Sequence, residues 1–228
     1  MGKLTDVRRS GGPRGGPGRQ RSVISPALFS FSLGKDAALL PLTPAITEPF
    51  HGLQVRNHER IGRWEPVPAV PPTLAETRNL LEVYGRSWLG GASVDTAIAV
   101  VLDDEWELAG AANLRVDHQQ RAAEFGCWLD PFFEGRGLAR RSFVALVDHA
   151  FNGLRLDRVT TRATADNERS RAMIEKLGFV QEGVHRKAVY FADGRRDEIS
   201  YAILSQEWAG GAGVSADGLS VLGAEKYP

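Results

Sequence analysis

The sequence predicts one α/β domain, built on a mixed sheet with helices on both faces. Strand-like and helix-like segments follow one another along most of the chain, and three strands come in a row before helices begin to alternate with strands. The composition, 43% hydrophobic and 25% charged, is typical of a globular protein that buries a core. A length of 228 residues suits one domain with tails.

The domain is expected to occupy residues 27–208, between tails at residues 1–26 and 209–228. The first tail is rich in Gly, Pro and Arg and contains six Lys or Arg against a single Asp, so it lacks the apolar residues that would compensate for ordering. Such a basic arm either contacts RNA or is dispensable. Over the whole chain 28 Lys and Arg balance 28 Asp and Glu, which gives no argument for nucleic acid or a membrane as partner.

Targeting and metal-binding signals are missing from the sequence. No apolar run approaches the roughly 18 residues of a membrane span, and no apolar stretch near the start resembles a secretory signal. The single Cys127 excludes an internal disulfide, so we expect a cytoplasmic protein. The five histidines show no metal-ligand spacing, and we expect no metal.

The first half of the domain predicts two helices. Pro49 weakens the start of the first one. The second begins at Thr73, and Glu76 three residues later completes the spacing of a capping box. Two short extended pieces are expected at residues 28–33 and 37–42. The first helix is expected at residues 44–64, a proline-rich connector at 65–72 and the second helix at 73–88.

The second half predicts most of the sheet. The first two of its strands are close enough for a hairpin through residues 103–105. Gly178 ends the last helix, as glycine often does, and the turn at residues 192–195 joins the final two strands. Three strands are expected at residues 96–102, 106–116 and 121–130, and a long helix at 138–154. A strand is expected at residues 158–164, a helix at 167–177 and a pair of strands at 179–191 and 196–204.

The stretch EGRGLA lies between the third of these strands and the long helix. A helix start has unpaired N–H groups and about half a positive charge, which suits a phosphate, and glycines let the backbone approach it closely. A plain strand-to-helix turn is the other interpretation. The residues expected to bind the anion are Glu134, Gly135, Arg136, Gly137, Leu138 and Ala139.

Six segments together resemble a known family. They are IGRWEP, AEFGCWLDPFFEGRGLA, DHAFNGLRLDRV, NERSRAMIEKLGFVQEGVHR, DGRRDEISYAIL and QEW. In this order, over roughly residues 30–208, they are similar to the RimJ/RimL-like branch of the GNAT N-acetyltransferases. The resemblance implies the GNAT fold, with a mixed, mostly antiparallel central sheet and helices on both faces. It also implies acetyl-CoA as co-substrate and a primary amine as acceptor.

The resemblance implies a pyrophosphate loop at this helix start. Gly137 and Ala139 fill two of the family's fixed positions. Glu134 stands where the family has Gln or Arg, and we expect its carboxylate to point to solvent because it would repel a pyrophosphate. Arg136 and Arg140 are expected either to pair with the coenzyme phosphates or to form a solvated basic face.

The resemblance also implies residues for the pantetheine arm. The strand before the loop diverges from its neighbour in this family, which assigns main-chain contacts to Trp128, Leu129 and Asp130, and an N–H there could polarise the thioester carbonyl. Asn167 matches a pantetheine-binding Asn, although a helix N-cap also explains it.

Glu124 is the candidate general base, acting through water. A carboxylate in an apolar strand gains a useful pKa if it is buried, and relatives often have Glu at this position; a solvent-facing strand residue is the other interpretation. Many GNAT enzymes use a tyrosine as general acid where this chain has Ile174. Ser170 is the expected substitute, with Tyr190 and Tyr201 as further options.

The acceptor is the least determined part of the reaction. The resemblance favours a protein N-terminal α-amine, including that of a ribosomal protein, and places Trp64 at the acceptor cleft. The alternatives are a polyamine, amino sugar or antibiotic, or an acyl-CoA-binding module without catalysis. An acetyl or a longer acyl donor and a homodimer paired through the C-terminal strands also stay open. Cys127, on the face opposite Glu124, is expected to be a buried small side chain and not a nucleophile.

Overall fold

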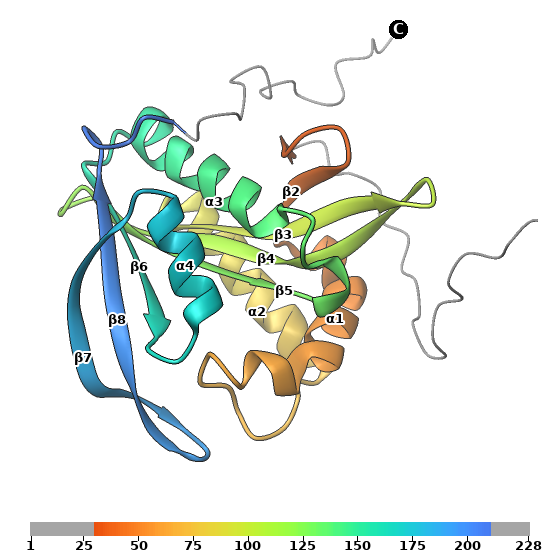
Figure 1. Ribbon diagram of the computed structural model, residues 1–228. Helices are drawn as coiled ribbons and strands as arrows, with labels where there is room; N and C mark the ends of the chain where they lie inside the picture. The colour runs from red at the N-terminus through yellow and green to blue at the C-terminus, as the bar shows by residue number, and fades with distance from the viewer. Residues whose placement is uncertain (1–29, 211–228) are drawn as a thin grey trace, which may run out of the picture.

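The computed structural model describes residues 30–210. The predicted tail at residues 1–26 and nearly all of the one at 209–228 lie outside this range. Within it, one sheet runs through eight strands in the order β1-β2-β3-β4-β5-β6-β8-β7 (Figure 1). Every neighbouring pair is antiparallel except β5 and β6, so the predicted mixed, mostly antiparallel sheet is confirmed.

The elements follow the predicted order. The strands are β1 Phe31–Ser32, β2 Ala37–Pro41, β3 Ser93–Leu102, β4 Glu105–Asp117, β5 Ala122–Leu129, β6 Arg158–Thr164, β7 Val180–Phe191 and β8 Gly194–Leu204. The α-helices are α1 Thr47–Ile61, α2 Leu74–Leu89, α3 Leu138–Asp148 and α4 Glu168–Lys176. Short 3-10 turns lie at η1 Pro44–Ile46 and η2 Pro131–Phe133, and a π-helical turn lies at η3 His149–Gly153.

Local sequence signals explain several boundaries. The capping box of α2 is present: the Glu76 N–H donates to Thr73 Oγ1 (3.3 Å), and the Thr73 N–H donates to the Glu76 carboxylate (2.7 Å). Asp103 and Asp104 both have positive φ, which suits the twist of a two-residue hairpin. The long helix expected at residues 138–154 instead ends as α3 and continues as the π-turn η3.

Two separate cores cover the two faces of the sheet. Helices α3 and α4 pack on one face, where the ring of Phe143 lies 3.9 Å from that of Phe125 and 4.9 Å from that of Phe179, centroid to centroid. Helices α1 and α2 pack on the other, over the small side chains of Ala97 and Ala99 (Figure 1). The predicted helices on both faces are thus confirmed. In the part of the chain that the structure describes, no helix is long and apolar enough to cross a membrane.

Candidate active site

The loop between β5 and α3 is the clearest anion-binding feature. Gly135 and Gly137 have φ of +77° and +71°, a region that favours glycine. A Cβ added at either residue would meet nothing within 4 Å, so the space above the loop is open. No side chain caps α3 at Gly137, and its first turn carries no acidic residue. The N–H groups of Leu138 and Ala139 therefore begin a helix that suits a phosphate.

Basic side chains surround this helix start. A pocket of about 350 Å³ lies between α3 and α4, lined by Arg140, Arg169, Ala172, Met173, Lys176 and Leu177. Three cations over an apolar floor match a ligand that carries both phosphates and an apolar ring. Arg136 lies elsewhere, with its guanidinium 5.4 Å from the ring centres of Phe132 and Phe133.

Strands β5 and β6 diverge next to the loop. Their parallel pairing has four positions and ends at Phe125 and Thr161, while β5 continues to Leu129. The Thr161 hydroxyl donates to the Phe125 carbonyl (3.0 Å) at this last position. Beyond it, among the described residues, the edge of β5 has no strand partner on the β6 side. We call residues 126–129 of β5, on this side, the open edge.

Alternation decides which peptide groups point to the open edge. The Asp130 N–H donates to the Ala109 carbonyl on β4 (2.8 Å), and a Cβ on Gly110 would lie 2.2 Å from the Trp128 carbonyl. Trp128 and Asp130 therefore direct their peptide N–H and C=O groups toward β4. Those of Cys127 and Leu129 point away from β4, toward the open edge. Of the three expected main-chain contacts only Leu129 faces the open edge. Cys127, which was not expected there, faces it as well.

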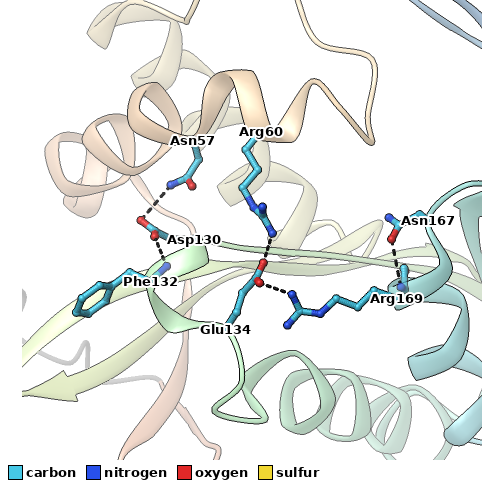
Figure 2. Close-up of polar contacts among 8 residues, drawn as sticks. Asn57, Arg60, Asp130, Phe132, Glu134, Asn167 and Arg169 are labelled. Carbon is cyan, nitrogen blue, oxygen red and sulfur yellow. Dashed lines mark hydrogen bonds and ion pairs between the residues drawn. The ribbon is translucent and has the colours of Figure 1, made fainter.

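Asp130 fastens α1 to the loop between β5 and α3. Its buried carboxylate accepts hydrogen bonds from Asn57 Nδ2 (3.2 Å) and the Phe132 N–H (2.9 Å), as Figure 2 shows. It also accepts one from Arg56 Nε (2.7 Å). Burial by itself would raise the pKa of Asp130, but these hydrogen bonds and the charge of Arg56 outweigh it and lower that pKa. The side chain of Asp130 thus holds the loop in place.

The expectation that Glu134 points to solvent is wrong. Its carboxylate lies between two guanidinium groups, those of Arg60 on α1 and Arg169 on α4, and pairs with both (Figure 2). The glutamate is therefore neutralised by neighbours from both sides of the sheet. The negative charge expected to disturb a pyrophosphate is largely compensated within the protein.

Glu124 is less buried than a desolvated base requires. Its side chain is 37% exposed, and its nearest cation is Arg162 on β6, with Nε 3.8 Å from Oε1. It lies on the α1 and α2 face of β5, paired across the sheet with Arg115 and Thr160. A base in this position remains open to water, which is compatible with proton transfer through a water molecule.

The start of α4 brings Asn167 and Ser170 together. Asn167 caps the helix: its side-chain oxygen accepts from the Ser170 N–H (3.2 Å). The predicted N-cap role is confirmed, and a contact with pantetheine stays a prediction. Ser170 is half-buried beside it. Ile174, at the position where the family resemblance led us to expect a tyrosine, is 1% exposed and packs in the core on the α3 face of the sheet.

The other candidate acids and the thiol are held in structural contacts. Tyr201 is fully buried under α4, where its hydroxyl accepts from Arg171 Nε and donates to Glu175, both at 3.1 Å. Tyr190 is exposed, and Arg195 lies 5.7 Å from its ring centre. Burial raises the pKa of Cys127 to about 12. A thiol of that pKa is a poor nucleophile.

Sequence reasoning missed the part that α1 plays in the site. Arg56 and Arg60 are four residues apart and therefore share one helix face, which was the available signal. The partners of that face, Asp130 and Glu134, are more than 70 residues away and could not be inferred from spacing. Among residues 30–210, no group of three or more His, Cys, Asp or Glu could hold a metal ion.

Comparison with known proteins identifies the family. The model described as "Acetyltransferase (GNAT) domain" matches residues 38–180. The chain is 30% identical over 184 residues to the "Putative ribosomal N-acetyltransferase YdaF" of Bacillus subtilis, covering 80% of this chain and 99% of that protein. It is 29% identical over 108 residues to the spermidine N(1)-acetyltransferase of Vibrio cholerae, covering 47% of this chain and 62% of that protein.

Solved structures share the fold. A crystal structure described as "Probable acetyltransferase" has a TM-score of 0.74 at 28% identity, covering 80% of this chain and 100% of the other. The ribosomal L7/L12 α-N-protein acetyltransferase RimL, in complex with coenzyme A, has a TM-score of 0.72 at 22% identity, covering 77% and 98%. This chain belongs to the GNAT acetyltransferase family, in its RimJ/RimL-like branch.

Proposed function

We propose that this protein transfers the acetyl group of acetyl-CoA to a protein N-terminal α-amine. The observation that carries the proposal is the open edge of β5, which leads directly into the uncapped start of α3. This arrangement offers an extended amide-containing arm a strand edge and offers a pyrophosphate a helix start. The similarity to a ribosomal-type N-acetyltransferase over 80% of the chain supports the protein α-amine as acceptor.

The donor is expected to run along the open edge. The peptide groups of Cys127 and Leu129 would pair with the amides of the pantetheine arm, as an added strand would. Asn167 would contact the same arm from α4. The pyrophosphate would lie on the N–H groups from Gly135 to Ala139, and the pocket with Arg140 and Lys176 would take the remaining nucleotide.

The acetyl group would pass to the amine in one direct attack. The amine nitrogen bonds to the thioester carbon, the carbon–sulfur bond breaks, and the sulfur leaves as a thiolate. An N–H donor of the open edge, such as that of Leu129, would stabilise the oxyanion. We assign Glu124 as the base, acting through water, and Ser170 as the candidate donor of a proton to the thiolate.

The choice of an α-amine follows from proton energetics. An α-amine has a pKa of about 7.7–8.0, whereas a lysine amine has about 10.4. Deprotonation at pH 7 therefore costs about 1 kcal/mol for the first and about 4.6 kcal/mol for the second. A base as exposed as Glu124 suits the smaller requirement.

A polyamine acceptor is the second candidate, because the chain is also similar to a spermidine N(1)-acetyltransferase over about half its length. The test is thiol release from acetyl-CoA with peptides, spermidine and aminoglycosides, with succinyl-CoA in parallel. Turnover with peptides that have a free α-amine, and none with the same peptides blocked at that amine, would support the proposal. Turnover with spermidine alone would replace it. Acetyl-CoA binding without turnover on any amine would favour a binding module.

A further inference from the structure

The connection between α1 and α2 is fastened to the far side of the sheet by Arg196 of β8. The Arg196 guanidinium donates to the Arg63 carbonyl (2.7 Å) and pairs with Asp166 (3.5 Å), just before the start of α4. It also pairs with Asp193 (2.8 Å) and lies 4.4 Å from the ring centre of Phe191. One side chain, 25% exposed, thus joins this connection to β8 and to the loop before α4.

A second anchor lies a few residues earlier in the chain. Arg60, in the last turn of α1, pairs with Glu134 in the loop between β5 and α3 (Figure 2). The segment that follows therefore starts at the loop between β5 and α3 and reaches the loop before α4. These two loops follow the carboxyl ends of β5 and β6, one on each side of the gap between the strands. Trp64 and Glu65 lie on this segment, immediately after the anchored Arg63. The two fixed points hold residues 60–63 at this gap, and Glu65 follows two residues later, where its N–H donates to the Ile61 carbonyl (2.9 Å).

The electrostatic neighbours of Glu65 agree with this placement. Its charge acts on Tyr84 of α2, and Arg115 of β4 acts on it, both from the α1 and α2 face. It also acts on Cys127, whose side chain points to the opposite face. Tyr84, Arg115 and Cys127 therefore lie within electrostatic range of Glu65, which agrees with a position close to β4 and β5. Glu65 is an exposed residue; desolvation by the surrounding protein raises its pKa, and the charge of Arg115 partly opposes this.

We propose that Glu65 binds the ammonium group of the acceptor and accepts the first of its protons. This inference rests on the proposed function, since it needs an amine acceptor and a thioester at the open edge. The expected acceptor is one whose ammonium group is presented singly at the end of a chain, as in a peptide.

The proton balance assigns different protons to the two carboxylates. An ammonium nitrogen loses two protons on its way to an amide. Glu65 takes the first, giving a carboxylic acid and a neutral amine that attacks the thioester. Glu124, through water, takes the second as the carbon–nitrogen bond forms. The carbon–sulfur bond breaks, the thiolate takes a proton from Ser170, and the proton held by Glu124 is passed through water to restore the Ser170 hydroxyl. Glu65 then returns its proton to solvent, with which it keeps contact.

The charged groups around Glu65 set the expected pH dependence. The charge of Arg115 on β4 acts on Glu65, and that of Glu65 acts on Tyr84 of α2 and Cys127 of β5. Asp95 of β3 also acts on Tyr84, and Glu124 pairs with Arg162 on the neighbouring strands β5 and β6. The productive pair is an ionised Glu65 with a protonated amine. Wild-type kcat/KM should therefore be level between the pKa of Glu65 and that of the amine, and fall on either side.

The test is the pH profile of Glu65→Gln with tetrapeptide amides that begin with Ser, Ala, Met or Gly. Without the carboxylate only the neutral amine reacts, so kcat/KM should rise about 60-fold between pH 6 and pH 9 for an α-amine pKa of about 7.8. KM for the peptide at neutral pH should rise about tenfold or more. The Kd of acetyl-CoA should stay within about twofold, which also shows that the variant is folded.

Two matched variants control the test. Glu59→Gln removes an exposed carboxylate of α1 near the same segment and should keep the wild-type profile. Glu124→Gln should lower kcat/KM by a similar factor at every pH and leave the profile level. A Glu65→Gln enzyme with wild-type KM and a level profile would overturn the inference, as would a rising profile in Glu124→Gln alone. If wild-type enzyme acetylates none of the peptides, the proposed function fails and the inference with it.

Discussion

Replacing Glu134 by glutamine tests how far the negative charge of the loop between β5 and α3 is compensated by neighbouring arginines. In the structure the Glu134 carboxylate pairs with Arg60 and Arg169, and the side chain of Arg169 is 69% exposed. Glutamine keeps the shape of the side chain and removes one negative charge. Both guanidinium groups then lose an anionic partner, and Arg169 is free to turn to a phosphate in the neighbouring pocket.

Two effects of this change have opposite signs. The free energy of unfolding should fall by about 1 kcal/mol, because the pair with the largely exposed Arg169 contributes little and the pair with Arg60, 37% exposed, contributes most of the loss. Acetyl-CoA should bind more tightly, because a unit charge at roughly 8 Å from a phosphate costs about 0.5 kcal/mol in water and about 2 kcal/mol at an effective dielectric constant of 20. That range corresponds to a Kd about 2- to 30-fold lower.

Calorimetric titration of acetyl-CoA at two salt concentrations, together with thermal unfolding, measures both quantities. The gain in affinity should shrink at high salt, since ions screen exposed charges. Glu105→Gln, in the distant β3–β4 hairpin, is the charge-matched control and should change neither quantity. Weaker binding by Glu134→Gln would refute the reasoning and would mean that the carboxylate helps the coenzyme by positioning the two arginines.

Three further changes probe the anchors of the site. Gly137→Val should abolish measurable acetyl-CoA binding, because it puts a β-branched residue at a φ of +71° and fills the open space above the loop; unchanged affinity by calorimetry would move the anion site elsewhere. Asp130→Asn should lower the free energy of unfolding by about 2 kcal/mol, less than for a fully buried pair because Arg56 is 34% exposed. Because the pKa of Asp130 is lowered in the folded protein, the difference in free energy of unfolding between wild type and variant should be largest above the unfolded pKa of 3.8. It should shrink as the pH falls through the folded pKa. Urea unfolding at several pH values measures this difference, and a value that did not change with pH would contradict the stabilising role given to the ionised carboxylate. Arg196→Met should raise KM for a peptide acceptor about tenfold while the Kd of acetyl-CoA stays within about twofold, and an equal loss of both would show that Arg196 only stabilises the fold.

The fold could be predicted from the sequence because its signals are local. The capping box at Thr73, the alternation in β5 and the glycine at residue 178 each act within a few residues, and each is found in the structure. The α3 boundary was missed because the change to a π-turn at residue 149 alters a hydrogen-bond pattern without changing the apolar periodicity.

The site was harder to predict, because its key contacts are distant in the chain. Glu134 was expected in solvent because nothing near it in the sequence reveals Arg60 as its partner. Glu65 stands in a proline-rich connector without periodicity, and the proposal that it acts at the site depends on the anchoring of Arg63 by Arg196, which the sequence does not reveal. Main-chain contacts could have been predicted better: alternation along β5 already requires Cys127 and Leu129, and not Trp128, to face the same edge.

The short pairing between β5 and β6 affects the rigidity of the sheet. The sheet is continuous from β1 to β5 and again from β6 to β7. Within residues 30–210 the strands of these halves pair at four positions, and one more backbone hydrogen bond, from the Asp157 N–H to the Arg121 carbonyl (2.7 Å), lies just before them. A ligand that binds along the open edge and also contacts α4 would therefore hold the two halves of the sheet together and add to the contacts between them. Amide hydrogen exchange should then slow on both sides of the gap together, in Cys127 and Leu129 and at the start of α4, so the protein is expected to become stiffest at the moment when both substrates are in place.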